Sequence, residues 1–250
     1  MALRNIILAA IAVGVITGIV YGLFQQTQIN PIIYGAEEYE VTDAPLAHSH
    51  NTDAAANVEA QEPEEAWSPE DGAQRITSTM VANITIAIAY ALVMISLMAL
   101  HDAKSNKPKI SAKQGAVWGI AALIALFIAP ALFGLHPEVP GTVAAELINR
   151  QQWWMFCAGI SVTGIAVLYY SANKFKFIGI ILLAAPHIVG APLPESHGFA
   201  NTAPEAVSAL SQLTSEFFLM TSIGMALFFI LLGSLSGWVV NRFIHLNESA

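Results

Sequence analysis

Six long apolar stretches, separated by polar segments, constrain the fold of this chain more than any other feature. They are Asn5–Phe24, Ile76–Leu100, Gly115–Gly134, Gln152–Ala172, Phe177–Ala191 and Phe217–Val240. A bilayer core about 30 Å thick needs roughly 20 apolar residues per helical span. Charged residues are only 11% of the chain, against about 25% in soluble proteins. The pattern predicts an all-α, polytopic transmembrane bundle of six spans, forming one membrane domain over residues 1–250.

The basic residues predict how this bundle is oriented. With the N-terminus in the cytoplasm, inside segments hold eight of the ten Lys and Arg residues, and only Arg75 and Arg150 lie outside. Cytoplasmic segments of membrane proteins carry the excess of basic residues. An even number of spans then places both termini in the cytoplasm. We expect a multi-pass protein of the cell membrane, the inner membrane of a bacterium. The fifth stretch is short, but without it Arg242 would lie outside.

The first stretch also contains a possible helix-packing motif. Gly14, Gly18 and Gly22 recur every four residues, which places them on one ridge of the helix. Small residues at this spacing let a second membrane helix approach closely. The alternative is that these glycines are simply tolerated in a membrane helix.

Residues 25–74 form the longest segment between two predicted spans, on the outer side. This segment has 11 carboxylates between Glu37 and Asp71, two histidines (His48 and His50) and few large apolar residues. Low hydrophobicity with high net charge predicts a largely irregular loop. A negative outer mouth would concentrate divalent cations. The alternative is an acidic linker with no ion preference.

Several function classes are excluded by residues that the chain lacks. Ten basic against 18 acidic residues disfavour a partnership with nucleic acid. No phosphate-binding loop of the G-x-x-x-x-G-K-[ST] type is present, so we expect no ATP bound by this chain. The single cysteine, Cys157, excludes a thiolate zinc cage. Without a His-Glu-x-x-His pattern or a nucleophile motif, an intramembrane enzyme is disfavoured, and no organic cofactor is expected.

Candidate metal ligands gather where predicted spans meet the outer side. These residues are His136, Glu138, His187, His197 and Glu216. Imidazole nitrogen and carboxylate oxygen suit borderline divalent metals such as Co²⁺, Ni²⁺ and Zn²⁺. A transport site must also release its ion, so a few such donors completed by water fit better than a thiolate cage. The sequence therefore predicts an outward-facing histidine and carboxylate site.

Each candidate also has a simpler interpretation. His136 can cap a turn, and His187 can make a hydrogen bond between helices. Glu216 opens the last apolar stretch, where the helix dipole favours a carboxylate. Glu146 is expected to pair with Arg150, one helical turn later.

Two prolines predict interrupted helices near these ligands. Pro130 and Pro186 each remove one helical N–H donor and free the carbonyl four residues earlier, on Leu126 and Leu182. Interrupted helices at membrane depth are tolerated where they line a buried or wet cavity. They are also typical of transporter sites.

Four motifs in this order resemble a known family. They are Trp67-Ser68-Pro69-Glu70-Asp71-Gly72 with Arg75, then Leu135-His136-Pro137-Glu138-Val139-Pro140-Gly141, then Arg150-Gln151-Gln152-Trp153-Trp154, then Pro186-His187-Ile188-Val189-Gly190-Ala191-Pro192. Over essentially the whole chain, the sequence is similar to the CbtA family of probable cobalt transporter subunits. The resemblance implies a multi-span subunit for cobalt uptake, tied to cobalamin supply. It also implies a small single-span partner, CbtB, with a histidine-rich end.

Together these observations predict a membrane subunit that takes up cobalt or a similar divalent transition-metal ion. The transported ion would be Co²⁺, with Ni²⁺ or Zn²⁺ as alternatives. The alternative function is a non-transporting membrane scaffold or accessory subunit of a metal-uptake complex.

Overall fold

In a computed structural model of the protein, the described residues (2–40, 69–105, 110–132 and 134–244) fold into helices and contain no strand. In chain order the elements are α1 (Ala2–Phe24), the π-helical η1 (Gln25–Ile29), α2 (Asn30–Glu37), α3 (Ala73–Lys104), α4 (Ala112–Leu123), the π-helical η2 (Ile124–Ile128), α5 (Ala129–Leu132), α6 (Leu147–Tyr170), the 3₁₀ turn η3 (Asn173–Phe175), α7 (Lys176–Val189) and α8 (Pro204–Phe243). Helices satisfy every backbone hydrogen bond within one segment, as lipid requires. The predicted all-α fold is confirmed.

Five helical segments in the described part of the chain are long and apolar enough to cross a membrane. They are Leu3–Glu37, Ala73–Lys104, Ala112–Leu132, Leu147–Tyr170 and Pro204–Phe243. The predicted fifth span corresponds to α7, which has only 14 residues. At 1.5 Å per residue α7 is about 21 Å long, shorter than the roughly 30 Å bilayer core. The structure therefore supports a multi-pass membrane protein, but the prediction of six spans is not confirmed.

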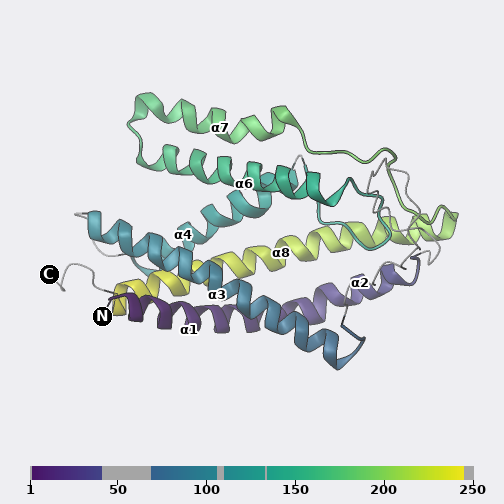
Figure 1. The fold of residues 1–250 in the computed structure, drawn as a ribbon, viewed down its shortest axis with the longest axis horizontal. Helices are drawn as coiled ribbons and strands as arrows, with labels where there is room; N and C mark the ends of the chain where they lie inside the picture. The colour runs from purple at the N-terminus through teal and green to yellow at the C-terminus, as the bar shows by residue number, and fades with distance from the viewer. Residues whose placement is uncertain (1, 41–68, 106–109, 133, 245–250) are drawn as a thin grey trace, which may run out of the picture.

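The two ends of the bundle carry different parts of the chain (Figure 1). At one end, here called the terminus end, the Asn5 side-chain amide donates to the backbone carbonyl of Phe243 at 3.4 Å. The opposite end, here called the loop end, holds residues 134–146 and 190–203 together with the end of α2 and the start of α3. Helix α7 runs back along α6 from the terminus end to the loop end. The start of α1 and the end of α8 therefore lie side by side. The location of this end in the cytoplasm stays a prediction.

Part of the predicted outer loop 25–74 is helical. Gln25–Glu37 continues α1 through η1 into α2. Two of the polar residues after Phe24 are accommodated within the helix by hydrogen bonds: the Asn83 amide on α3 donates to Gln25 Oε1 at 2.6 Å, and the Thr27 hydroxyl donates to the Leu23 carbonyl of its own helix at 3.0 Å. Residues 41–68, including His48, His50 and most of the acidic residues, lie outside the described part of the chain. For them the irregular loop remains a prediction.

Glycines bring two pairs of helices into backbone contact. Helix α1 packs on α3, and a Cβ added at Gly14 or Gly18 would lie 2.4–2.5 Å from backbone atoms of α3. Helix α4 packs on α8, where a Cβ at Gly119 would lie 2.1 Å from the Phe229 carbonyl oxygen. Such collisions show that these crossings depend on the missing side chains. The predicted packing role of the α1 ridge is confirmed, and α1, α3, α4 and α8 form the core of the bundle.

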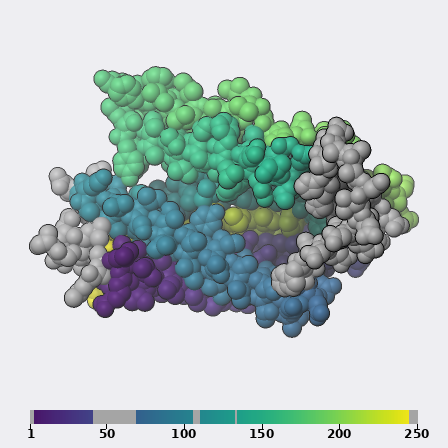
Figure 2. Space-filling model, viewed as in Figure 1, coloured from purple at the N-terminus to yellow at the C-terminus, as the bar shows by residue number. Residues whose placement is uncertain are grey.

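Helices α6 and α7 form a hairpin beside this core. They approach each other at Gly164 and Gly179, where an added Cβ would lie 2.7–3.0 Å from the facing glycine's carbonyl oxygen. Helix α6 reaches the core mainly through η2 and α5, whereas α7 packs on α6 and η3. In the space-filling view an open notch separates the green hairpin from the blue α3 at the terminus end (Figure 2). Among the described residues, the hairpin therefore meets the core mainly through α6.

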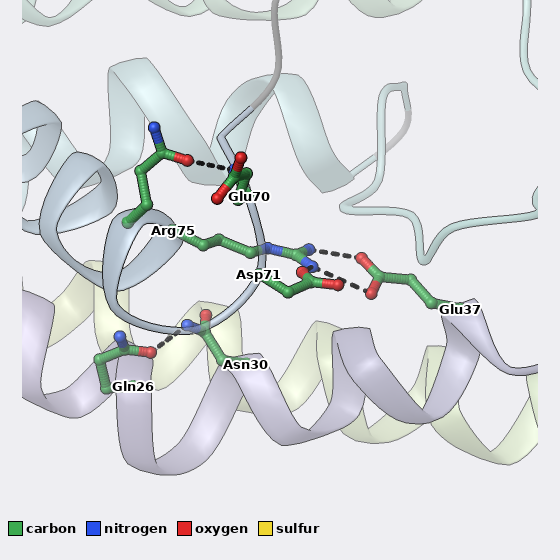
Figure 3. A network of polar contacts seen from close by, with 7 residues as sticks. Gln26, Asn30, Glu37, Glu70, Asp71 and Arg75 are labelled. Carbon is green, nitrogen blue, oxygen red and sulfur yellow. Dashed lines mark hydrogen bonds and ion pairs between the residues drawn. The ribbon is translucent and has the colours of Figure 1, made fainter.

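Polar contacts fasten the segments of the loop end to one another. Arg75 in the first turn of α3 reaches Glu37 at the end of α2, with Nη2 2.5 Å from Oε1, and also bonds Asp71 at 3.0 Å (Figure 3). Residues 134–146 pair with 190–203 through two backbone hydrogen bonds, Val143 N–H to the Gly198 carbonyl and Ala200 N–H to the Gly141 carbonyl, both 2.9 Å. These contacts hold the loop end in one arrangement.

Candidate functional site

A surface hollow of about 430 Å³ lies at the loop end. Its lining comes from α2, α6, α8 and the segment between α5 and α6, and includes Ile33, His136, Glu138, Thr142, Arg150 and Phe217. Below it, Val139 is buried against Ile32, Ala36 and Leu210. This apolar floor holds the 136–142 segment against α2 and α8, so the histidine and the carboxylate are fixed on the rim of one hollow.

Glu138 is bound to an arginine within the hollow. Arg150 Nη1 lies 2.8 Å from Glu138 Oε2, and each side chain is about one-third exposed. The sequence instead suggested that Arg150 pairs with Glu146. That suggestion is wrong, because Glu146 accepts a hydrogen bond from Asn149 at 3.1 Å. Residues 134–146 fold back toward the start of α6, and this tertiary contact replaces the pairing along the helix.

His136 lies on the same hollow and is exposed. Its ring contacts Phe218 of α8 edge to face, with the ring centroids 6.1 Å apart. An aromatic contact limits the orientations of the imidazole without using its ring nitrogens. His136 and Glu138, two residues apart in sequence, are thus the two predicted ligands that the structure brings together.

Glu216 lies beside this hollow without lining it. Helix α8 begins at Pro204, so Glu216 is in its interior and does not open a helix as the sequence analysis expected. The helix starts early because residues 204–216 pack onto α2, where Leu210 is buried with Ile32 and Ala36. Glu216 is exposed and accepts a hydrogen bond from Gln212 at 2.9 Å.

The other two predicted ligands lie elsewhere. His187 is half-buried near the end of α7, directly after the buried Pro186, and does not line the hollow. His197 is exposed in the 190–203 segment. It directly precedes Gly198, whose carbonyl binds the Val143 N–H beside the hollow. In the part of the chain that the structure describes, no three His, Cys, Asp or Glu side chains form a group that could hold a metal ion. His136 and Glu138 could supply two of a metal's ligands.

The sequence analysis expected Pro130 and Pro186 to interrupt their helices, but α7 continues through Pro186 and Pro130 lies within the helical run Ala112–Leu132. Pro130 follows the π-helical turn η2, in which the Ala129 N–H bonds the Ile124 carbonyl. A π-helical turn widens the helix, which helps it to absorb a residue with no N–H. Pro186 lies inside α7, which ends three residues later at Val189 and is capped by Gly190. Gly190 has φ of 82°, a conformation that suits glycine at a helix end.

The charges at the loop end are strongly unbalanced. Within the described residues, this end has two arginines, Arg75 and Arg150, and each is ion-paired. The described carboxylates there are Glu37, Glu38, Glu40, Glu70, Asp71, Glu138, Glu146, Glu195, Glu205 and Glu216. A surface with this excess of negative charge attracts cations and speeds their arrival.

The sequence analysis missed three residues that shape the hollow. Phe217 and Phe218 look like ordinary apolar residues of a span, and Arg150 looks like an interfacial base. Their contacts with His136 and Glu138 join segments about 12 and 80 residues apart, and no local spacing signals such contacts.

Comparison with known proteins identified one family. A family model described as "Probable cobalt transporter subunit (CbtA)" matches residues 3–241, nearly the whole chain. The searches of curated proteins and of solved structures found no match.

Proposed function

Because the chain belongs to the CbtA family of probable cobalt transporter subunits, we propose that it takes up Co²⁺ through the hollow that contains His136 and Glu138. Ni²⁺ and Zn²⁺ have similar ligand preferences and are alternative cargoes. The loop end faces outward, and the terminus end lies in the cytoplasm of a bacterial cell. The protein is a transporter subunit and not an enzyme, and it uses no organic cofactor.

The observation that carries this proposal is one imidazole and one carboxylate on the rim of the same hollow. Two protein donors bind a divalent ion weakly, and water completes the coordination shell. Weak binding suits an entry site, because the ion must leave it for the next step. The surrounding carboxylates raise the local concentration of Co²⁺.

In this arrangement α7 completes the sixth crossing together with the segments at its two ends. Its short helix is bounded by η3 and by residues 190–194, which belong to no helix. A helix shorter than the hydrocarbon core can still cross where the bilayer thins locally. His187 then lies near the outer end of this crossing.

The proposal is tested by Co²⁺ flux into liposomes that contain the purified chain. We expect His136→Ala and Glu138→Gln to weaken Co²⁺ binding by at least about tenfold, since losing even an outer-shell partner costs about 10- to 100-fold. Glu146→Gln is the matched control, because this nearby carboxylate does not line the hollow. Equal losses in Glu138→Gln and Glu146→Gln would contradict the site.

His187 and His197 are tested in the same assay. We expect His187→Ala to reduce flux without changing Co²⁺ binding at the hollow, because His187 lies farther along the proposed path. His197→Ala changes binding less than His136→Ala, because His197 does not line the hollow. Unchanged flux in a His187→Ala variant that inserts normally removes that residue from the path.

Uptake also depends on pH. A histidine must be neutral to bind a metal, and its ordinary pKa is about 6.5. We expect Co²⁺ uptake to fall as the external pH drops below about 6, and His136→Ala to flatten this dependence. An identical pH profile in the variant would show that the pH dependence of uptake does not come from His136.

Two observations favour the accessory-subunit alternative. The family is described as a subunit, and no three-ligand metal group forms within the described residues. A small CbtB-type single-span subunit is the proposed partner. If liposomes with this chain alone admit no Co²⁺, and adding the partner restores flux, the chain acts only within a complex.

A further inference from the structure

Arg150 occupies the place beside Glu138 that a metal ion would need. Its Nη1 lies 2.8 Å from Glu138 Oε2, inside the same hollow as His136. A divalent cation at this carboxylate would stand close to a guanidinium that is always protonated. The two positive charges repel, and partial burial of the pair reduces the screening of that repulsion. Glu138 therefore binds either Arg150 or the incoming cation tightly, not both.

The guanidinium is held loosely enough to be displaced. Among the described residues, Glu138 is its one hydrogen-bond partner, through one of five N–H donors. The Nε atom of Arg150 is buried and donates to no described group. Ion pairs that remain partly exposed contribute little stability. Breaking this one therefore costs little.

A second hollow offers the side chain an alternative position. This hollow of about 380 Å³ is lined by Arg150 itself with Leu135, Leu147, Gln151, Trp154 and Met155. Trp154 presents a ring on which a guanidinium can stack, and Gln151 has a side-chain carbonyl that can accept a hydrogen bond. Arg150 therefore stands between two hollows and can turn from the first into the second.

We propose that Arg150 is a tethered internal cation that competes with the transported metal ion for Glu138, and that the ion must displace it. This inference rests on the proposed metal site. Displacement lowers the affinity of the outer site and keeps Glu138 neutralised while the site is empty. When the ion moves on, Arg150 returns to Glu138 and opposes rebinding from outside.

The test measures binding of Co²⁺ alone to the purified full-length chain by calorimetry. We expect Arg150→Gln to bind Co²⁺ about five- to tenfold more tightly, because the competing charge is removed. Arg150→Lys keeps the charge and stays close to wild type. Arg150→Met is a second charge-removing variant that keeps a long apolar stem, for use if the glutamine variant misfolds.

Two controls make the result specific. Arg75→Gln removes the other arginine of the described loop end, which is also ion-paired but does not line the hollow, and it leaves Co²⁺ affinity within about twofold, since it lies outside the competing pair. In the Glu138→Gln background, Arg150→Gln does not increase Co²⁺ affinity, because the carboxylate for which the arginine and the metal ion compete is absent.

The outcomes separate this inference from the proposed function. If Glu138→Gln weakens binding but Arg150→Gln does not strengthen it, displacement is overturned and the metal site stands. Weaker binding in Arg150→Gln overturns displacement as well, because the arginine then assists binding. If Glu138→Gln binds Co²⁺ as wild type does, the metal site is overturned together with this inference.

Discussion

The helical core and the α6–α7 hairpin are assembled by different means. In the core, α4 and α8 touch backbone to backbone at Gly115, Gly119, Gly233 and Gly237. The hairpin has one such contact inside itself, at Gly164 and Gly179, but it joins the core through side chains. The comparison indicates that lipid-embedded helices packed by glycines form a fixed frame, whereas a side-chain-attached hairpin can shift against that frame.

Besides the packing of α6 on η2 and α5, side-chain contacts attach the hairpin near its two ends. At the loop end Trp153 is buried with Ala129 and Cys157, and Arg150 pairs with Glu138. At the terminus end His101 Nδ1 lies 2.9 Å from the Tyr170 hydroxyl. Between these points α6 meets α4 only sparsely. A shift of the hairpin would therefore change the shape of the hollow, because Arg150 in the first turn of α6 lines it.

The largest expected effect comes from breaking the core. Gly119→Val places a branched side chain against the Phe229 carbonyl, which an added Cβ would approach to 2.1 Å. We expect the free energy of unfolding in detergent to fall by about 3 kcal/mol or more, at the upper end for overpacking. Gly159→Val is the matched control, since no atom lies within 4 Å of its added Cβ. Equal losses in the two variants would show that the crossing is not tight.

An intermediate effect comes from loosening the hairpin at the loop end. Trp153→Ala leaves a cavity beside Ala129 and Cys157. We expect a loss of about 2 kcal/mol, less than for a soluble core, because helix association in lipid lacks the water-transfer contribution. Hydrogen exchange should rise in α6 and α7 and stay unchanged in α4 and α8. An equal rise in all four helices would contradict a separate hairpin.

The smallest effect comes from the terminus end. Tyr170→Phe removes the hydroxyl that bonds His101, and we expect a loss of about 1 kcal/mol, the usual net value of one hydrogen bond. The control is Tyr169→Phe, since the Tyr169 ring also contacts His101. An equal loss in the Tyr169 variant, which keeps its ring but also loses a hydroxyl, would show that the hydrogen bond to His101 does not attach this end.

The candidate site was partly predictable. His136 and Glu138 were identified because imidazole and carboxylate stand beside turn-forming residues, and the structure places both on one hollow. The partnership of Glu138 with Arg150 was not predicted, because spacing along a helix pointed to Glu146. The start of α8 at Pro204 was also not predicted, because many residues before Phe217 are polar and were interpreted as a loop.

The sequence by itself determined the class of this protein. Apolar stretches of about 20 residues fit helical spans, and a helix satisfies its backbone hydrogen bonds within one segment in lipid. The four motifs indicate the family. The glycine ridge of α1 was also visible, because helical periodicity alone places its members on one face. Only the tertiary structure decided which helix each glycine meets, how far α8 extends and which carboxylate Arg150 binds. These depend on contacts between segments far apart in the chain, and local periodicity holds no information about them.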